Sequence, residues 1–180
     1  LFYKVDQIIE PLRKIAENLA LPIMLLLFRM HVAAVFLSSG LSRLDSFLKG
    51  AWDTQVFLFE LEHPVPGLSP NMAAVITTGA ELILPLLLLF GLFGRVGAAG
   101  LLVMTTVIEF TYSHQAAALD LCLKNTGLLS CIYRPDHLIW ASMLLPLLII
   151  GSGKFSLDFW MVKWVRASAK KPSSTIAEKE

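Results

Sequence analysis

The sequence Ala80-Glu81-Leu82-Ile83-Leu84-Pro85 lies inside an apolar run that extends from Met72 to Phe93. A run of this length suits a helix that crosses the hydrocarbon core of a bilayer, for which roughly 20 residues are needed. A carboxylate within such a helix is energetically costly and commonly marks a functional site. The organising question for this chain is therefore which side chain faces Glu81.

The composition favours a membrane protein. The 180-residue chain is 56% hydrophobic and 16% charged, whereas soluble domains have about 25% charged residues. We expect the apolar runs to form an all-α membrane protein, a bundle of four transmembrane helices in contact with the lipid bilayer. The runs are Leu19–Ser39, Met72–Phe93, Val96–Ser113 and His137–Gly151.

Basic residues lie mostly on one side of these runs. That side carries both ends of the chain and Arg95, whereas the other side carries Arg43, Lys49, Lys124 and Arg134. Because loops rich in Lys and Arg stay in the cytoplasm, the pattern predicts a multi-pass protein of a bacterial inner (plasma) membrane with both termini cytoplasmic. The net charge of +1 and the lack of a basic stripe with interleaved aromatic residues predict no nucleic-acid partner.

The two ends of the chain differ from the middle. Residues 1–18 place apolar side chains at helical spacing between charged ones, which predicts an amphipathic helix on the inner membrane face. A cytoplasmic helix docked on protein is the alternative. We expect residues 19–160 to form the four-helix transmembrane domain. Residues 161–180 are rich in Lys, Ser and Glu and predict a basic, mostly disordered cytoplasmic tail.

Arg29 lies near the middle of the first apolar run, on one helix face with Phe36, Gly40 and Arg43. With a rise of 1.5 Å per residue, Arg29 would lie roughly 15 Å into a core about 30 Å thick. Glu81 reaches a similar depth from the other side, so we expect the two charged groups to pair at mid-membrane. The pair has two interpretations, a structural ion pair and the centre of a polar pocket.

The third run becomes polar toward its outer end. Thr105 and Glu109 share a helix face there, and we expect Glu109 to lie in the outer third of the membrane, partly solvated. These groups extend the predicted pocket toward the outside. The candidates for ligand binding or proton relay are Arg29, His31, Glu81, Glu109, Tyr112 and His114.

Cys122 and Cys131 lie in the predicted outer connection, with eight residues between them. This spacing matches neither a redox C-x-x-C motif nor a zinc site. A disulfide, two inert thiols and a weak copper-binding pair all stay open. The histidines show no metal spacing with one another, so we assign no metal site from the sequence.

Several blocks of the sequence, in order, resemble the DoxX family of small four-helix membrane proteins. The likeness extends roughly from Leu25 to Phe159. The blocks are Arg29, Phe36 and Ser39-Gly40-Leu41-Ser42, then Trp52-Asp53-Thr54, Leu58-Phe59-Glu60 and Val65-Pro66, then Ala80-Glu81-Leu82, Pro85 and Gly91-Leu92-Phe93-Gly94-Arg95, and finally Pro135-Asp136-His137-Leu138-Ile139-Trp140-Ala141 and Gly151-Ser152-Gly153-Lys154-Phe155-Ser156-Leu157-Asp158.

The resemblance implies a role in redox chemistry, sulfur metabolism or metal stress. Relatives are linked to thiosulfate oxidation that passes electrons to quinone, to a membrane complex with superoxide dismutase and a sulfurtransferase, and to copper homeostasis. It therefore implies an inner-membrane subunit that anchors partner proteins, at most one subunit of a quinone-linked oxidoreductase. The sequence has no haem motif and no cluster-type cysteine set, so no covalently bound cofactor is expected and a quinone is the candidate cofactor.

Two other functions compete with a quinone or sulfur pocket. The first is a structural anchor without a ligand, in which the loop Leu41–Pro70 offers Phe57, Phe59 and Leu61 as a docking surface stiffened by prolines. The second is a transporter of small molecules or ions. Four spans are few for alternating access, so a transporter would require a homo-oligomer, a state that the sequence leaves open.

Overall fold

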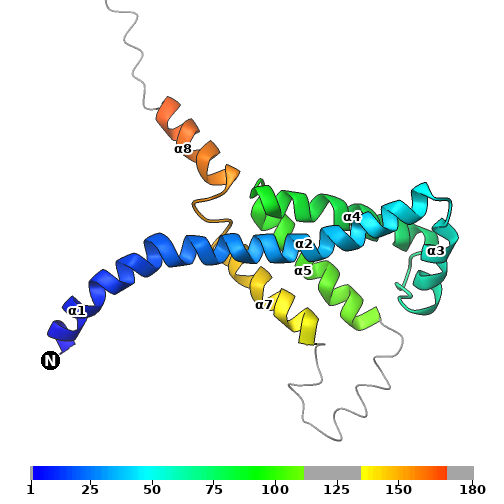
Figure 1. The fold of residues 1–180 in the computed structure, drawn as a ribbon, viewed down its shortest axis with the longest axis horizontal. Coiled ribbons are helices and arrows are strands. Elements are labelled where there is room, and N and C mark those ends of the chain that lie inside the picture. The colour runs from blue at the N-terminus through cyan, green and yellow to red at the C-terminus, as the bar shows by residue number, and fades with distance from the viewer. Residues whose placement is uncertain (1, 112–134, 170–180) are drawn as a thin grey trace, which may run out of the picture.

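The structure is a computed structural model that describes residues 2–111 and 135–169. Within these two ranges the chain is helical and contains no strand, in agreement with the predicted all-α class. The elements, shown in Figure 1, are α1 (Phe2–Ile15), η1 (Ala16–Ala20), α2 (Leu21–Leu48), α3 (Trp52–Leu61), α4 (Pro70–Phe90), α5 (Gly94–Thr111), α7 (Pro135–Ile149) and α8 (Leu157–Ala169).

The first three elements form one long curved helix (Figure 1). The short segment η1 is a π-helical turn, and α2 begins directly after it with Pro22 in its first turn. Proline has no backbone N–H to donate, and a wider local turn is one way in which a helix accommodates such an interruption. The curve carries α1 away from the bundle, while α2 crosses the whole of it.

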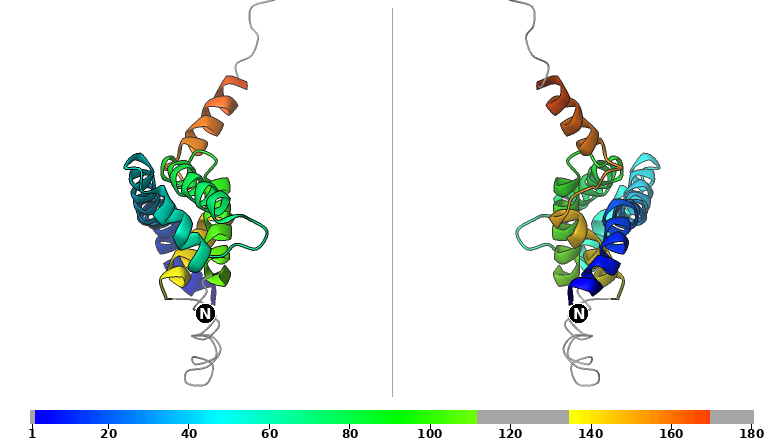
Figure 2. Two further views of the ribbon diagram at one scale, coloured as in Figure 1. Left: turned by 90° about the vertical axis from the view of Figure 1, so that its right-hand side faces the viewer. Right: turned by 90° about the vertical axis from the view of Figure 1, so that its left-hand side faces the viewer.

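The bundle is built around α2. This helix packs against α4 and α7, while α5 packs against both α4 and α7. The shorter α3 covers α4 and α2 at the end far from α8, and the views in Figure 2 show α8 directed away from the bundle. The core shared by these helices consists of Leu25, Val32, Phe36, Leu88, Ala98, Leu101, Leu144 and Leu147.

Local sequence signals fix the ends of α4. Ser69 accepts a hydrogen bond from the backbone N–H of Met72, and Pro70 occupies the first turn, where no N–H partner is needed. At the other end Gly91 adopts the left-handed conformation with φ 64°, which glycine tolerates best. The helix therefore runs from Pro70 to Phe90, close to the predicted Met72–Phe93 span.

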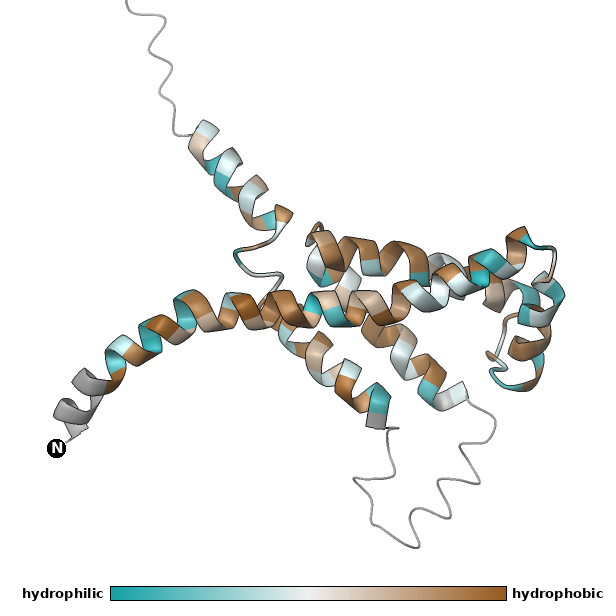
Figure 3. Ribbon diagram, viewed as in Figure 1, coloured by the Kyte–Doolittle hydropathy of each residue, from teal (hydrophilic) through white to brown (hydrophobic). Residues whose placement is uncertain are grey.

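Two helices are long and apolar enough to cross a membrane, by length and composition, within the described ranges. They are the continuous helix Ile9–Leu48 and α4, while Asp136–Ile149 is a shorter apolar helix. Brown, hydrophobic residues predominate along α4 in Figure 3. Its outward face exposes large apolar side chains, as expected of a helix in contact with lipid: Val75, Ile76, Ile83, Leu86 and Phe90.

Three predicted segments differ from the structure. The first span does not end at Ser39, because α2 continues to Leu48. The predicted loop Leu41–Pro70 contains a helix, since α3 occupies Trp52–Leu61. This helix buries Phe59 against Ala73 and Ala74, so Phe59, contrary to the prediction, is not part of a docking surface. The predicted disordered tail begins in a helix, because α8 continues to Ala169.

Candidate functional site

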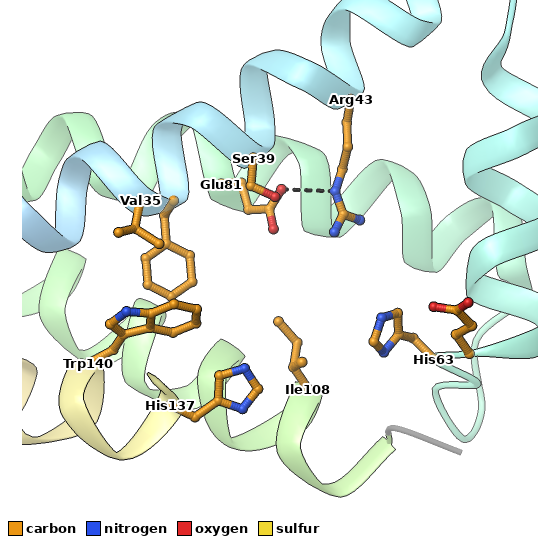
Figure 4. A pocket seen from close by; sticks show the side chains of 10 residues that line it. Val35, Ser39, Arg43, His63, Glu81, Ile108, His137 and Trp140 are labelled. Atoms are coloured by element: carbon orange, nitrogen blue, oxygen red, sulfur yellow. Dashed lines mark ion pairs between the residues drawn. The ribbon is translucent and has the colours of Figure 1, made fainter. Parts of the chain in front are cut away.

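A pocket of about 330 Å³ lies between α2, α4, α5 and α7, next to the segment that follows α3 (Figure 4). Its lining combines an apolar and aromatic part with polar and charged groups. The polar groups come from four separate parts of the chain: α2, α4, α7 and the segment that follows α3. The lining residues are Val35, Phe36, Ser39, Arg43, Glu62, His63, Glu81, Ile108, His137 and Trp140.

The carboxylate of Glu81 is paired with Arg43 of α2. Nε of Arg43 lies 3.1 Å from Oε2 of Glu81, which is ion-pair distance, although the N–H is not aligned for a hydrogen bond. Ser39 stands beside the carboxylate (Figure 4). The side chain of Glu81 is 3% exposed and that of Arg43 20% exposed, so the pair is largely withdrawn from solvent.

Gly40 is what allows α2 and α4 to approach so closely at this pair. A β-carbon placed on Gly40 would lie 2.9 Å from Cβ of Glu81 and 3.0 Å from its backbone carbonyl. Such distances are shorter than real side chains tolerate, so any other residue would force the two helices apart. Small residues serve this purpose between membrane helices in general.

The predicted pairing of Arg29 with Glu81 is wrong. Nη2 of Arg29 donates a 2.7 Å hydrogen bond to the backbone carbonyl of Phe155, and Nη1 lies against Gly91, at the far end of α4. Gly91 is ten residues beyond Glu81, or about 15 Å along the helix axis. The prediction failed because α2 extends to Leu48, which moves Arg43, rather than Arg29, to the level of Glu81.

A second polar pair lies across the pocket. Nδ1 of His137, in the first turn of α7, makes a short hydrogen-bonded contact with Oε2 of Glu109 on α5. Glu109 is 1% exposed, so the expectation of a partly solvated carboxylate is wrong. A buried carboxylate needs a partner, and the start of α7 supplies one.

An aromatic wall separates the pocket from the core. The rings of Phe36 and Trp140 meet edge to face, with centroids 5.3 Å apart, and the ring of His137 lies 5.0 Å from that of Trp140. On the opposite side the guanidinium of Arg43 lies 5.1 Å from the centroid of the Phe59 ring. Both contacts are favourable for rings and cations in an apolar setting, and they hold Arg43 and His137 at the pocket surface.

The remaining predicted site residues either do not line this pocket or lie outside the described residues. His31 is exposed and does not line this pocket, whereas Thr105 is buried and donates its hydroxyl hydrogen to the carbonyl of Leu101. Tyr112, His114, Cys122 and Cys131 lie outside the described residues, so their predicted roles stay predictions.

Sequence reasoning missed four charged or imidazole-bearing residues of the pocket: Arg43, Glu62, His63 and His137. Arg43 had been placed on the correct face of α2 but was counted as a flanking charge outside the membrane. His137 carried a usable signal, because an acid as deep as Glu109 requires a donor and His137 begins the next apolar run. His63 follows α3, and no periodicity pointed to it.

The charge balance limits what the pocket can hold. Its lining has one guanidinium, from Arg43, against the carboxylates of Glu62 and Glu81, together with two imidazoles. Such a set repels an anion more than it attracts one. Donors next to an aromatic wall suit a neutral ring that carries hydrogen-bond acceptors.

The sequence model of the DoxX family matches residues 24–114, about half of the chain. This chain belongs to the DoxX family. An uncharacterized protein of Haemophilus influenzae is 30% identical over 138 residues, which cover 74% of this chain and 80% of the relative. No solved structure matches the chain.

Family membership agrees with the apolar helices in making this DoxX protein a membrane protein. The matched region extends from α2 to the end of α5, so it contains both the Arg43–Glu81 pair and Glu109. His137 lies beyond it, which means that the second polar pair joins the matched region to the helix that follows.

Proposed function

We propose that this DoxX protein is a bacterial inner-membrane subunit of a redox, sulfur or metal-stress system, and that its pocket binds the ring of a quinone. In this proposal α2, α4, α5 and α7 cross the membrane, both termini are cytoplasmic, and α1 lies on the membrane surface. The observation that carries the proposal is the pocket itself, in which two polar pairs face each other beside an aromatic wall.

The placement of donors supports a quinone. A quinone ring is flat and neutral, with carbonyl oxygens at opposite edges, so it requires an apolar wall and donors on two sides. Trp140 and Phe36 supply the wall, Arg43 stands on one side, and the His137–Glu109 pair stands on the other. Reduction of a quinone also consumes protons, and the imidazole of His137, which is hydrogen-bonded to Glu109, is placed to deliver one. The guanidinium of Arg43 stays protonated, so it can only donate hydrogen bonds to the ring oxygen on its side.

A sulfur oxyanion is supported less well. Glu62 and Glu81 line the same pocket as the guanidinium of Arg43, so an anion would meet two carboxylates for one permanent cation. Electrostatic repulsion in a site of low dielectric is strong. The neutral ligand is therefore the better match.

The anchoring role is supported by a separate surface. Around the end of α2 and along α3, large apolar side chains are more than half exposed: Phe47, Leu48, Phe57 and Leu61. The electrons for a bound quinone would come from a partner protein, and this surface lies at the pocket end of the bundle. Docking there would bring a redox partner close to the ring.

Titration with a short-chain quinone, followed by quenching of tryptophan fluorescence, tests the pocket in the purified full chain. Trp140 forms the wall, so binding should quench it, and Trp140→Phe should remove most of that change. We expect Glu81→Gln to weaken binding about tenfold, the effect of losing roughly 1.4 kcal/mol of contact through a misplaced Arg43.

Glu60→Gln is the matched control, because Glu60 is exposed on α3 and does not line the pocket. Its affinity should equal that of the natural chain. Equal affinity in the Glu81→Gln variant would remove Glu81 from the ligand site. Quenching by thiosulfate but not by the quinone would replace the proposed ligand by a sulfur species.

A further inference from the structure

A second pocket, of about 440 Å³, lies at the other end of the bundle, where the α4–α5 turn meets the segment between α7 and α8. Its polar lining differs in charge from that of the first pocket, because two permanent cations stand against one carboxylate. Its lining includes the side chains of Arg95, Ser152, Lys154, Asp158, Phe159 and Val162.

The carboxylate of Asp158 is already engaged. Its two oxygens accept hydrogen bonds from the backbone N–H groups of Phe93 and Gly94, at 2.9 and 3.0 Å. Asp158 therefore caps the N-terminus of α5, where an anion is favourable. This contact also fixes the first turn of α8 against the bundle. Asp158 acts electrostatically on Arg29 as well, so among the described residues its single carboxylate stands near three cations, Arg29, Arg95 and Lys154.

Buried donors without a partner lie at the same place. The hydroxyl of Ser152, which lines the pocket, is buried and has no hydrogen-bond partner among the described residues. Just behind it, Arg29 is 0% exposed, and neither its Nε nor its Nη1 has a partner within those residues. Buried donors are normally satisfied, so this cluster calls for an acceptor that the described chain does not supply.

Gly91 holds these groups together. A β-carbon on Gly91 would collide with Nη1 of Arg29 and with the side chain of Ser156, and it would lie 3.1 Å from Cβ of Ser152. Arg29 and the two serines are thus gathered around a single glycine at the end of α4. The side chains of Arg95 and Lys154 are exposed beside this cluster and bind Ile149, Ile150 and Asn18 through some of their donors.

We propose that this second pocket binds a phosphate group, such as that of an anionic phospholipid headgroup. Arg95 and Lys154 contact its oxygens from the open side, Ser152 donates its hydroxyl hydrogen from below, and Arg29 adds positive charge behind. Charge-assisted contacts of this kind are strong and specific for phosphate. The side chains of Phe159 and Val162 border the same pocket and suit an acyl chain.

Native mass spectrometry of the full chain in mild detergent, with phosphatidylglycerol or phosphatidylcholine added, tests this site. We expect phosphatidylglycerol to be retained in preference. Lys154→Glu should lower its retention about tenfold, because an attractive charge-assisted contact becomes a repulsive one. Lys163→Glu makes the same charge change on exposed α8, where Lys163 lies over the ring of Trp160, and should alter retention less than about twofold.

Ser152→Ala provides a second variant that changes no charge. It should weaken retention of phosphatidylglycerol severalfold while leaving the far-UV circular dichroism of the chain unchanged. Competition by excess inorganic phosphate distinguishes the two sources of the group. Displacement supports a site for free phosphate, and resistance to displacement together with a loss in Lys154→Glu supports a lipid headgroup.

Equal retention of the two lipids would overturn the proposal, as would equal losses in Lys154→Glu and Lys163→Glu. Neither outcome depends on the quinone pocket, which lies at the other end of α2. Quinone binding measured in the Lys154→Glu variant should be the same as in the natural chain.

Discussion

Two arginines on the buried face of α2 have opposite surroundings. Arg43 lies at the α3 end and faces the carboxylate of Glu81 at 3.1 Å, whereas Arg29 lies at the α8 end and bonds a single backbone carbonyl. They are 14 residues apart, about 21 Å along the helix. The same residue type on the same face therefore serves one region as part of an ion pair, and another as a cation that has no direct ion pair among the described residues and feels only the more distant charge of Asp158.

This difference between the two arginines has different consequences for stability and for ligand binding. Where a buried cation has its carboxylate, removing one partner leaves an uncompensated charge and destabilises the fold. Where a buried cation has donors to spare, the missing acceptor points to a ligand. We therefore expect that removing the carboxylate of Glu81 at the α3 end costs more stability than removing the cation of Arg29 at the α8 end.

The largest effect is expected from Glu81→Ala. The substitution leaves Arg43 largely buried without its carboxylate, and we expect a loss of about 3 kcal/mol in the free energy of unfolding, within the range for breaking a buried pair. Unfolding in increasing mole fractions of SDS, followed by circular dichroism, measures it. The double variant Glu81→Ala with Arg43→Met removes the orphaned charge and should recover at least half of the loss.

Glu60→Ala is the control for this series, because Glu60 is exposed on α3, and its effect should stay within about 0.5 kcal/mol. If the double variant is no more stable than Glu81→Ala, the pair does not act as a unit. The contrast between the two arginines would then lose its basis at the α3 end.

A smaller loss is expected from Gly91→Ala. Gly91 has φ 64°, and a β-carbon in this left-handed conformation is unfavourable by roughly 1–2 kcal/mol. The added carbon would also collide with Arg29 and move it, so we expect a total loss of about 2 kcal/mol, measured by the same SDS titration. The substitution Gly91→Ala thus perturbs the geometry of the α8 end and leaves its charge unchanged.

Gly79→Ala is the matched control within the same helix. A β-carbon on Gly79 meets nothing within 4 Å, and alanine is the better helix former by about 1 kcal/mol. The control should therefore be neutral or stabilising. Equal losses in both variants would show that α4 tolerates no alanine and that the cluster around Gly91 is not special.

Much of the fold followed from periodicity in the sequence. The face of α2 that carries Arg29, Phe36 and Gly40 is buried as expected, because the apolar and small residues recur at helical spacing. The limits of α4 followed from Ser69, Pro70 and the glycine after its end. These are local signals, and each acts within a few residues.

The pairing of charges did not follow, because it depends on how far one helix extends past another. Because α2 continues from Ser39 to Leu48, the observed partner of Glu81 is Arg43, which lies 14 residues after the predicted partner Arg29. No local pattern shows this, since residues 40–48 are polar enough to read as a loop. A carboxylate in one apolar run and arginines in another thus predict that a buried ion pair forms. They do not predict which arginine takes part in it.

The hydrogen bonds around residues 152–158 could not be predicted from the sequence either. They join η1, α2 and the α4–α5 turn to the segment that leads into α8, and their partners are separated by as many as 136 positions in the sequence. The phosphate pocket could therefore be inferred from the structure alone, although Arg29 itself had been marked by its position in an apolar run.

The smallest effect on stability is expected from Arg29→Met, although Arg29 is as deeply buried as any residue described. Arg29 has no direct ion pair among the described residues, so its removal also removes its desolvation penalty. This gain offsets the hydrogen bond to Phe155, which contributes about 1 kcal/mol, and the attraction of Asp158. The SDS titration should therefore show a change below about 1 kcal/mol in either direction. Retention of phosphatidylglycerol should nevertheless fall. If Arg29→Met instead destabilises the chain as much as Glu81→Ala, then Arg29 is a structural residue and the two ends of α2 are alike.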